Sequence, residues 1–119
     1  MTRHMSFMLT KEQVHNRTKT VTRRNGWWNL KQGEFVYMYE KCQGLKKGEK
    51  SVLIGQMQVI NTRPERLDAI TPEECAKEGF PGMTPIEFVA MFCKTHKGVK
   101  PETFINRIEF EYTNNPKNC

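Results

Sequence analysis

Two stretches of the sequence share one design, and each marks a position at which a helix begins. They are TPEE at 71–74 and TPIE at 84–87. In each, Thr stands at the cap, Pro at the first helical position and Glu at the third, which together form a capping box. The first helix is predicted over 71–78, where Gly79 ends it, and the second over 84–96. Any strands elsewhere in the chain must therefore share one fold with these helices.

The other apolar segments have the pattern of strands. Three runs alternate or are rich in β-branched and aromatic residues: EFVYMYE at 34–40, SVLIGQMQVINT at 51–62 and FINRIEFEY at 104–112. GLKKGEK at 44–50 separates the first two runs and is predicted to be a hairpin loop. The order of elements predicts a small mixed α+β domain with a curled sheet or an open barrel.

The last of these runs predicts one buried face and one wet face, because side chains alternate along a strand. The expected buried residues are Ile108, Phe110 and Tyr112, and the expected wet residues are Arg107, Glu109 and Glu111.

Helical spacing predicts which residues the helices bury. The helix over 84–96 should bury Phe88, Val89, Met91 and Phe92. A shorter helix is indicated by LTKEQVHNR at 9–17, where Thr10 could cap and Gln13 could return the bond.

Length and charge limit the domain organisation and the partners. The 119 residues fit one domain, with a core over about 7–112 and a polar, frayed tail at 113–119. The hydrophobic fraction of 37% allows only a modest core. The net charge of +6 favours polyanions or phosphorylated small molecules as partners.

Cysteine spacing and hydropathy point to the cytoplasm. The four cysteines, Cys42, Cys75, Cys93 and Cys119, form no CxxC pair, so reduced thiols are expected. No apolar run approaches the length of a membrane span, and the polar start MTRHMSFMLT is unlike a signal peptide. The chain is therefore expected to be cytoplasmic and without a membrane partner.

No metal or cofactor is expected. Cys93 and His96 form a C-x-x-H pair, but the sequence has no second pair at ligand spacing, and Cys93 is expected to pack beside Phe92. GLKKGEK lacks the pattern of a phosphate-binding loop and precedes a strand rather than a helix.

The stretch RTKTVTRRNGWW at 17–28 combines cations, threonines and two tryptophans. KTVTRR favours a strand, in which Thr20, Thr22 and Arg24 share one face and Val21 and Arg23 share the other. A pocket on the first face would receive a hydroxyl and a guanidinium side by side. The alternative is an ordinary solvated strand, which is the commoner use of these residue types.

The same region favours contact with nucleic acid. Adjacent residues of an extended segment point to opposite sides, so one of Trp27 and Trp28 should enter the core and the other be free to stack on a base. The residues predicted to bind a ligand or RNA are Arg17, Arg23, Arg24 and Trp27, with Lys46, Lys47 and Lys50 of the loop.

Glu78 is placed unusually, because a carboxylate in the last turn of a helix opposes the helix dipole. A nearby cation could compensate it. The alternative is a solvated Glu, satisfied by Lys77 or an arginine without any catalytic purpose.

Four segments in order, TKTVTRR, LKQGEFVYM, CAKEGF and RIEFEY, resemble the ASCH-domain family of the PUA-like superfold. The resemblance runs from about Phe7 to Tyr112. It implies a small curled β-barrel, with about three short helices packed at its openings and a pocket between barrel and helices.

That family includes RNA-binding modules, nucleases and amidohydrolases that remove an acyl group from the exocyclic amine of acetylcytidine. In the amidohydrolases a KTxT segment supplies a lysine and a threonine, which work with a glutamate from the following helix. The resemblance implies that Lys19, Thr22 and Glu78 take these catalytic roles, with Glu74 as the alternative to Glu78.

Two functions are left open by the sequence. The first is binding of RNA or of a nucleoside- or nucleotide-like ligand in a cationic cleft, and the second is deacylation of an acetylcytidine-like nucleoside. For deacylation, Lys19 can activate Thr22 only if its pKa falls from about 10.4 toward 7. Burial and the cations Arg17, Arg23 and Arg24 favour such a fall, whereas Glu78 opposes it.

Overall fold

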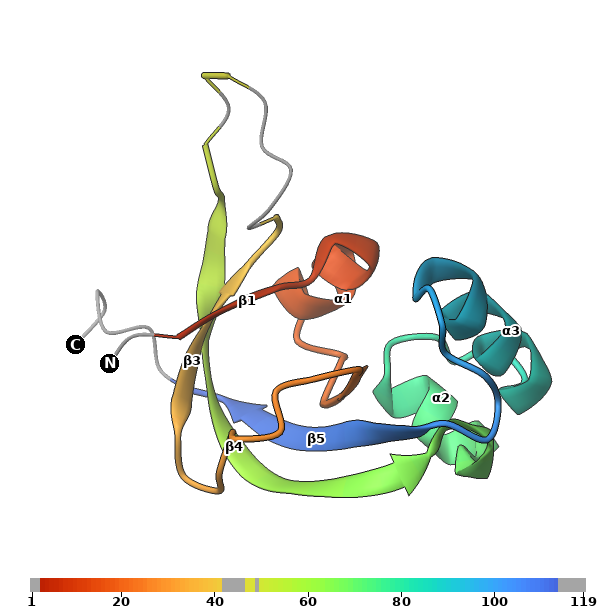
Figure 1. Ribbon diagram of the computed structural model, residues 1–119. Helices are drawn as coiled ribbons and strands as arrows, with labels where there is room; N and C mark the ends of the chain where they lie inside the picture. Colours follow the sequence, from red (N-terminus) through yellow and green to blue (C-terminus); the bar gives the residue numbers. More distant parts are fainter. Residues whose placement is uncertain (1–2, 42–46, 49, 114–119) are drawn as a thin grey trace.

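The chain folds into one curled sheet of five strands, with its helices gathered on one side (Figure 1). The computed structural model describes residues 3–41, 47–48 and 50–113. The strands are β1 (His4–Ser6), β2 (Val21–Arg24), β3 (Phe35–Tyr39), β4 (Leu53–Arg66) and β5 (Phe104–Tyr112). The helices are η1 (Met8–Thr10), α1 (Lys11–His15), η2 (Leu67–Ala69), α2 (Pro72–Lys77) and α3 (Pro85–Thr95). The predicted α+β class, a curled half-barrel with short helices, is confirmed.

The strand order is β1-β3-β4-β5-β2, so the long β4 lies at the centre of the sheet. It pairs antiparallel with β3 and with β5, while β1 joins β3 in parallel and β2 joins β5 antiparallel. Register shifts at 38/39 in β3 and at 59/61 in β4 bend the ladder. Bulges of this kind increase the local twist, which explains the curl of the sheet.

Strand β4 runs four residues beyond its predicted end, through Pro64 to Arg66. A proline interrupts a central strand, because it cannot donate to the ladder. Here the pairing with β3 begins at Gln58, and beyond that point β4 pairs only with β5. Pro64 therefore lies where one side of the strand has no partner strand within the described residues.

The antiparallel pairing of β3 with β4 confirms the predicted hairpin connection. Of its loop, residues 42–46 and 49 lie outside the described residues.

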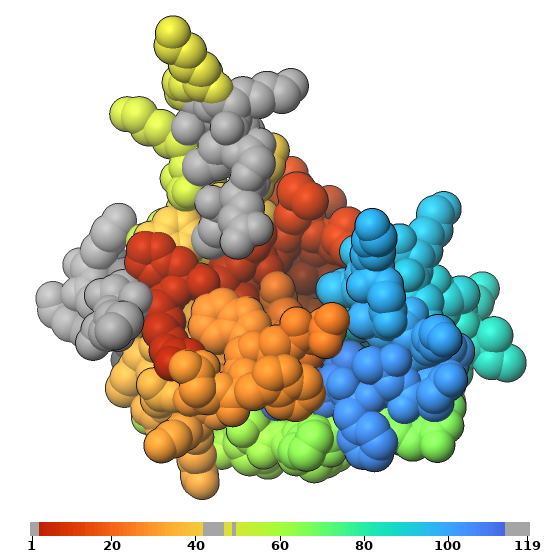
Figure 2. Space-filling view, viewed as in Figure 1, coloured from red at the N-terminus to blue at the C-terminus, as the bar shows by residue number. Residues whose placement is uncertain are grey.

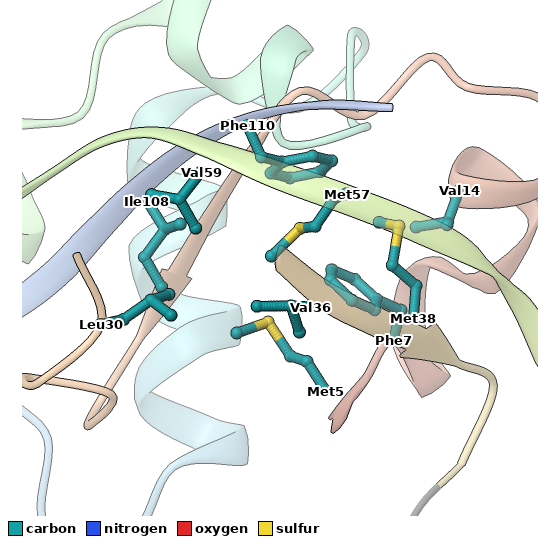
Figure 3. Close-up of a cluster of buried hydrophobic side chains, with 10 residues drawn as sticks. All are labelled: Met5, Phe7, Val14, Leu30, Val36, Met38, Met57, Val59, Ile108 and Phe110. Carbon is teal, nitrogen blue, oxygen red and sulfur yellow. The ribbon is translucent and has the colours of Figure 1, made fainter. Parts of the chain in front are cut away.

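The core is divided into two apolar clusters. The first lies between α1 and the sheet, where Phe7 and Val14 belong to the same buried cluster as Ile108 and Phe110 of β5 (Figure 3). The second lies under α2 and α3, where Phe88 and Phe92 meet Ile105. Strand β5 thus contributes a buried face to each cluster, and its two faces bind the two halves of the molecule together.

The predicted wet face of β5 is wrong at one residue. Ile108 and Phe110 are buried and Glu111 is exposed, as expected, but Arg107 is only 4% exposed. The reason is that the second cluster and α2 cover this part of the strand. The Arg107 guanidinium is accommodated there by the carboxylate of Glu74, with Nε to Oε1 at 2.6 Å and Nη2 to Oε2 at 3.0 Å.

Helix α3 begins with the complete capping box predicted for it. The Thr84 hydroxyl accepts from the Glu87 backbone N–H, and the Glu87 carboxylate accepts from the Thr84 backbone N–H. Phe88 and Phe92 are buried, whereas Val89 and Met91, expected to be buried, are only half-buried.

The other two predicted caps are incomplete. Thr71 accepts from the Glu74 backbone N–H, but the Glu74 carboxylate binds arginines instead of returning the bond. At α1, Thr10 makes no side-chain cap bond, and Gln13 donates its amide to the Gly79 carbonyl at 3.1 Å. In both cases a tertiary partner has taken the side chain that would have closed the box.

No helix within the described ranges is long and apolar enough to cross a membrane.

Replacing Thr84 by Ala should lower the free energy of unfolding by about 1 kcal/mol, because the cap at the start of α3 loses its acceptor. Thr84→Ser keeps a hydroxyl at the cap and should lose much less. Urea denaturation of the three proteins checks this, and equal losses in the two variants would contradict the capping role.

Candidate functional site

A cavity of about 400 Å³ lies between the start of β2, the segment Ser6–Thr10, the end of α2 and one face of α3. Figure 2 shows the surface recessed between the N-terminal segment, in red, and α3, in cyan and blue. Its polar end is formed by Lys19, Thr22, Arg23, Arg24 and Glu78. Its apolar wall is formed by Phe80, Phe88, Met91 and Phe92, with the exposed Met8 and Leu9 at its edge.

The polar end is organised around a buried ion pair between Lys19 and Glu78. Both residues are 3% exposed, and Lys19 Nζ donates to Glu78 Oε1 at 2.8 Å and to the Glu78 main-chain carbonyl at 2.8 Å. Glu78 is the C-cap of α2, and Gly79 follows it with a φ of 106°, which glycine adopts at little cost. One ammonium therefore compensates both the misplaced carboxylate and a free carbonyl at the helix end.

The backbone around Lys19 holds it against α2. The Thr20 N–H donates to the Lys77 carbonyl at 2.8 Å, and the Tyr112 hydroxyl donates to the Lys19 carbonyl at 2.5 Å. Burial lowers the pKa of the Lys19 ammonium, and the adjacent Glu78 carboxylate opposes that fall. Both effects agree in direction with the expectation from sequence.

Thr22 and Arg24 lie side by side in the cavity wall, as the alternation of β2 predicts. Arg24 Nε donates to Thr22 Oγ1 at 3.0 Å, and Arg24 Nη2 donates to the Ser6 carbonyl at 2.8 Å. The Arg24 guanidinium also lies over the Phe7 ring, 4.7 Å from its centre. Because Thr22 accepts from Arg24, its hydroxyl hydrogen points elsewhere.

Behind the polar end, three arginines lie opposite one another across the sheet and form what we call the arginine row. Arg23 of β2 is paired in register with Arg107 of β5, which is paired in turn with Arg63 of β4. Like charges directly opposite destabilise a sheet. Glu74 offsets this by accepting from Arg107 Nε at 2.6 Å and from Arg23 Nη2 at 2.9 Å, while Glu65 binds both Arg23 and Arg63.

The structure separates the two glutamates that the resemblance left as alternatives. Glu78 lines the cavity, whereas Glu74 binds Arg23 and Arg107 of the arginine row. Hydrogen bonds from Arg107, opposed by burial and supported by Arg23, lower the pKa of the Glu74 carboxyl to about 2.

Several residues predicted to bind a ligand lie away from the cavity. Arg17 is exposed, with its guanidinium 5.4 Å from the centre of the Tyr112 ring, and Lys47 and Lys50 are exposed outside the lining. Lys46 lies outside the described residues. Arg23 borders the cavity, but its side chain is 0% exposed and its terminal nitrogens are hydrogen-bonded to carboxylates.

The two tryptophans divide as predicted between core and surface. Trp27 packs against the first core cluster and is half-buried, whereas Trp28 is 55% exposed. The indole free to stack on a base is therefore Trp28 rather than Trp27. The turn brings this about, since Trp27 has a φ of 61° and directs its ring inward beneath Arg3.

Across the described residues, no group of three His, Cys, Asp or Glu side chains is placed to hold a metal ion. His96 stacks on Phe92, with ring centres 3.8 Å apart. Cys75 and Cys93 are free thiols, and Cys42 and Cys119 lie outside the described residues.

Sequence reasoning missed the apolar wall and the arginine row. Phe88, Met91 and Phe92 were assigned to the core because helical spacing cannot distinguish a core face from a cavity wall. The signal for the arginine row was the pairing register, which places Arg23 opposite Arg107, and a single sequence does not contain that register.

Replacing Glu74 by Gln should lower the free energy of unfolding at neutral pH by about 3 kcal/mol, because two arginines lose a shared carboxylate. A folded-state pKa of about 2, below the ordinary 4.5, means that this stabilisation is complete above pH 4.5 and is lost as the pH falls toward 2. Stability of the wild type should therefore decline more steeply over that window than that of Glu74→Gln. Glu73→Gln, at the exposed neighbouring residue, is the control, and urea midpoints against pH test the difference.

The comparisons with known proteins bear on the fold. No family model matches the sequence, and no curated protein matches it. The structure is similar to the crystal structure of protein EF3133 from Enterococcus faecalis V583, assigned to family model DUF984, with a TM-score of 0.61 and 12% sequence identity. The match covers 95% of this chain and 80% of the other. It supports the fold of the chain, a curled half-barrel sheet with short helices.

Proposed function

We propose that the protein binds a nucleoside- or nucleotide-like ligand in the cavity between β2, the N-terminal segment and α3. The supporting observation is that one cavity of about 400 Å³ combines an aromatic wall with Lys19, Thr22, Arg24 and Glu78. Its volume is typical of small-molecule pockets, which range over about 300–1,000 Å³. The wall suits the faces of a base, and the polar end suits a carbonyl or amide group.

An RNA strand would use this cavity through a single extruded base. The cations expected to track a phosphate backbone, Arg17 and Lys47, do not line it, and Arg23 is enclosed by carboxylates. The geometry therefore favours a mononucleoside-sized ligand over an extended strand.

A second function, deacylation of an acylated nucleoside amine, is supported by the contact of Lys19 with Glu78 beside Thr22. In this reaction neutral Lys19 takes the Thr22 hydroxyl proton while Oγ1 bonds to the acyl carbon. The carbon–nitrogen bond then breaks, and the amine leaves with a proton from Lys19. Water then attacks the acyl carbon and gives a proton to Lys19. The bond from that carbon to Thr22 Oγ1 breaks, the carboxylic acid leaves, and Lys19 returns the proton to Oγ1. Arg24, which already donates to Thr22 Oγ1, stands where it can donate to the carbonyl oxygen as charge develops.

Filling the cavity should weaken ligand binding. Met91→Trp places a larger side chain in the apolar wall and should weaken cytidine or acetylcytidine binding at least about tenfold. Ile86→Trp on the same helix, at a residue 83% exposed, is the matched control and should bind as the wild type does. Calorimetry with both nucleosides and with a short oligoribonucleotide tests this. Nucleoside binding that is unchanged in Met91→Trp would contradict a binding site in this cavity.

Deacylation should depend on the Thr22 hydroxyl. Thr22→Val should reduce release of acetate from acetylcytidine by about a thousandfold or more, because it removes the nucleophile. Thr20→Val, two residues earlier and outside the cavity lining, should retain the wild-type rate. The wild-type rate should rise with pH as Lys19 loses its proton, since burial places its pKa below the ordinary 10.5. Equal rates for the two variants would exclude Thr22 as the nucleophile.

A further inference from the structure

The Arg23 guanidinium is enclosed by three carboxylates from two elements. Its Nη2 donates to Glu65 Oε2 at 2.8 Å and to Glu74 Oε1 at 2.9 Å, and its Nη1 donates to Glu78 Oε2 at 3.1 Å. The side chain is 0% exposed, and its terminal nitrogens are bound by these carboxylates although the residue borders the cavity. Arg23 therefore acts on the site through these glutamates and through the charge of its guanidinium.

The contact with Glu78 divides that carboxylate between two cations. Oε2 faces Arg23, and Oε1 faces Lys19 Nζ at 2.8 Å. A carboxylate held at one oxygen can rotate about its side-chain bonds, whereas one held at both oxygens has a single orientation. Arg23 therefore fixes which oxygen of Glu78 meets Lys19.

Contacts other than the one with Glu78 hold Arg23 in place. Its strand is paired in register with Arg107, and Glu74 accepts from both guanidiniums. Glu65 holds it from β4. Arg23 is therefore a side chain of the sheet that is held in turn by Glu65 of β4 and by Glu74 of α2.

We propose that Arg23 is a positioning residue of the cavity, which holds Glu78 Oε2 from behind and thereby sets how strongly Glu78 Oε1 binds Lys19. The relevance of this positioning role to ligand binding rests on the proposed function. The effect of Arg23 on Lys19 does not, because it exists without a ligand.

The consequence is electrostatic. Arg23 takes part of the Glu78 charge and also repels the Lys19 ammonium, and both effects reduce the proton affinity of Lys19. The titratable or charged groups placed toward Lys19 are Glu78 of the α2 C-cap, Arg23 and Arg24 of β2, Tyr112 of β5 at its carbonyl, and His96 across the cavity after α3.

The test measures the Lys19 pKa directly, by NMR of full-length protein carrying ¹³Cε-labelled lysine, with no ligand present. Arg23→Gln should raise the Lys19 pKa by about one unit or more, because Glu78 then acts on Lys19 undivided. Arg63→Gln is the matched control: it removes the same charge and a bond to the same Glu65, but it is half-exposed and on the far side of the arginine row. It should shift the Lys19 pKa by only a few tenths. Equal shifts in both variants would overturn the proposal.

A second pair of variants covers the case in which Arg23→Gln does not fold. Glu65→Gln removes a competing acceptor of Arg23, whereas Glu109→Gln removes a carboxylate near Arg107. Glu65→Gln should lower the Lys19 pKa more than Glu109→Gln does, and equal effects would again overturn the proposal. Since no ligand enters either measurement, failure of the positioning role is distinguished from failure of nucleoside binding or deacylation, which the cavity-filling and Thr22 variants assess.

Discussion

The arrangement of the site depends on one interaction, the buried pair of Lys19 and Glu78. Removing two charges from water costs several kcal/mol each, and a single contact between them rarely offsets that cost. Here the ammonium also binds the Glu78 main-chain carbonyl, and the carboxylate also binds Arg23. The pair is therefore tolerated because each partner satisfies more than one group, and it joins the start of β2 to the end of α2.

The need to satisfy that pair extends through the sheet. Arg23 brings a further buried charge opposite Arg107, and Glu65 and Glu74 are required to balance them. A continuous set of ion pairs thus extends from the cavity across the sheet to α2. The same side chains that position the catalytic candidates also hold the helix against the sheet. In a chain with a modest apolar core, these buried ion pairs therefore help to hold α2 against the sheet.

Local patterns in the sequence were sufficient for the elements and for part of the site. The alternation of KTVTRR placed Thr22 and Arg24 together, and the odd position of Glu78 at a helix end indicated a nearby cation, which is Lys19. The prediction that Arg107 faces solvent was wrong because α2 covers that face of β5. The docking of α2 on the sheet is a tertiary contact, which the alternation of one strand does not reveal. The capping box expected of Glu74 failed for the same reason, since its arginine partners come from strands about 30 and 50 residues away in sequence. The C-terminal end of β4 was predicted too early because a proline normally ends a strand. That β4 has a partner strand on only one side at Pro64 is not evident from the sequence.

Gly79 has a consequence for how the chain tolerates change. A Cβ at this position would come within 2.9 Å of Gln13 Cγ, and the φ of 106° is unfavourable for any other residue. Even the smallest side chain would push apart α1 and the loop after α2, directly beside Glu78. The absence of a methyl group at Gly79 therefore permits the close approach of α1 to the end of α2, between residues 66 positions apart in the sequence.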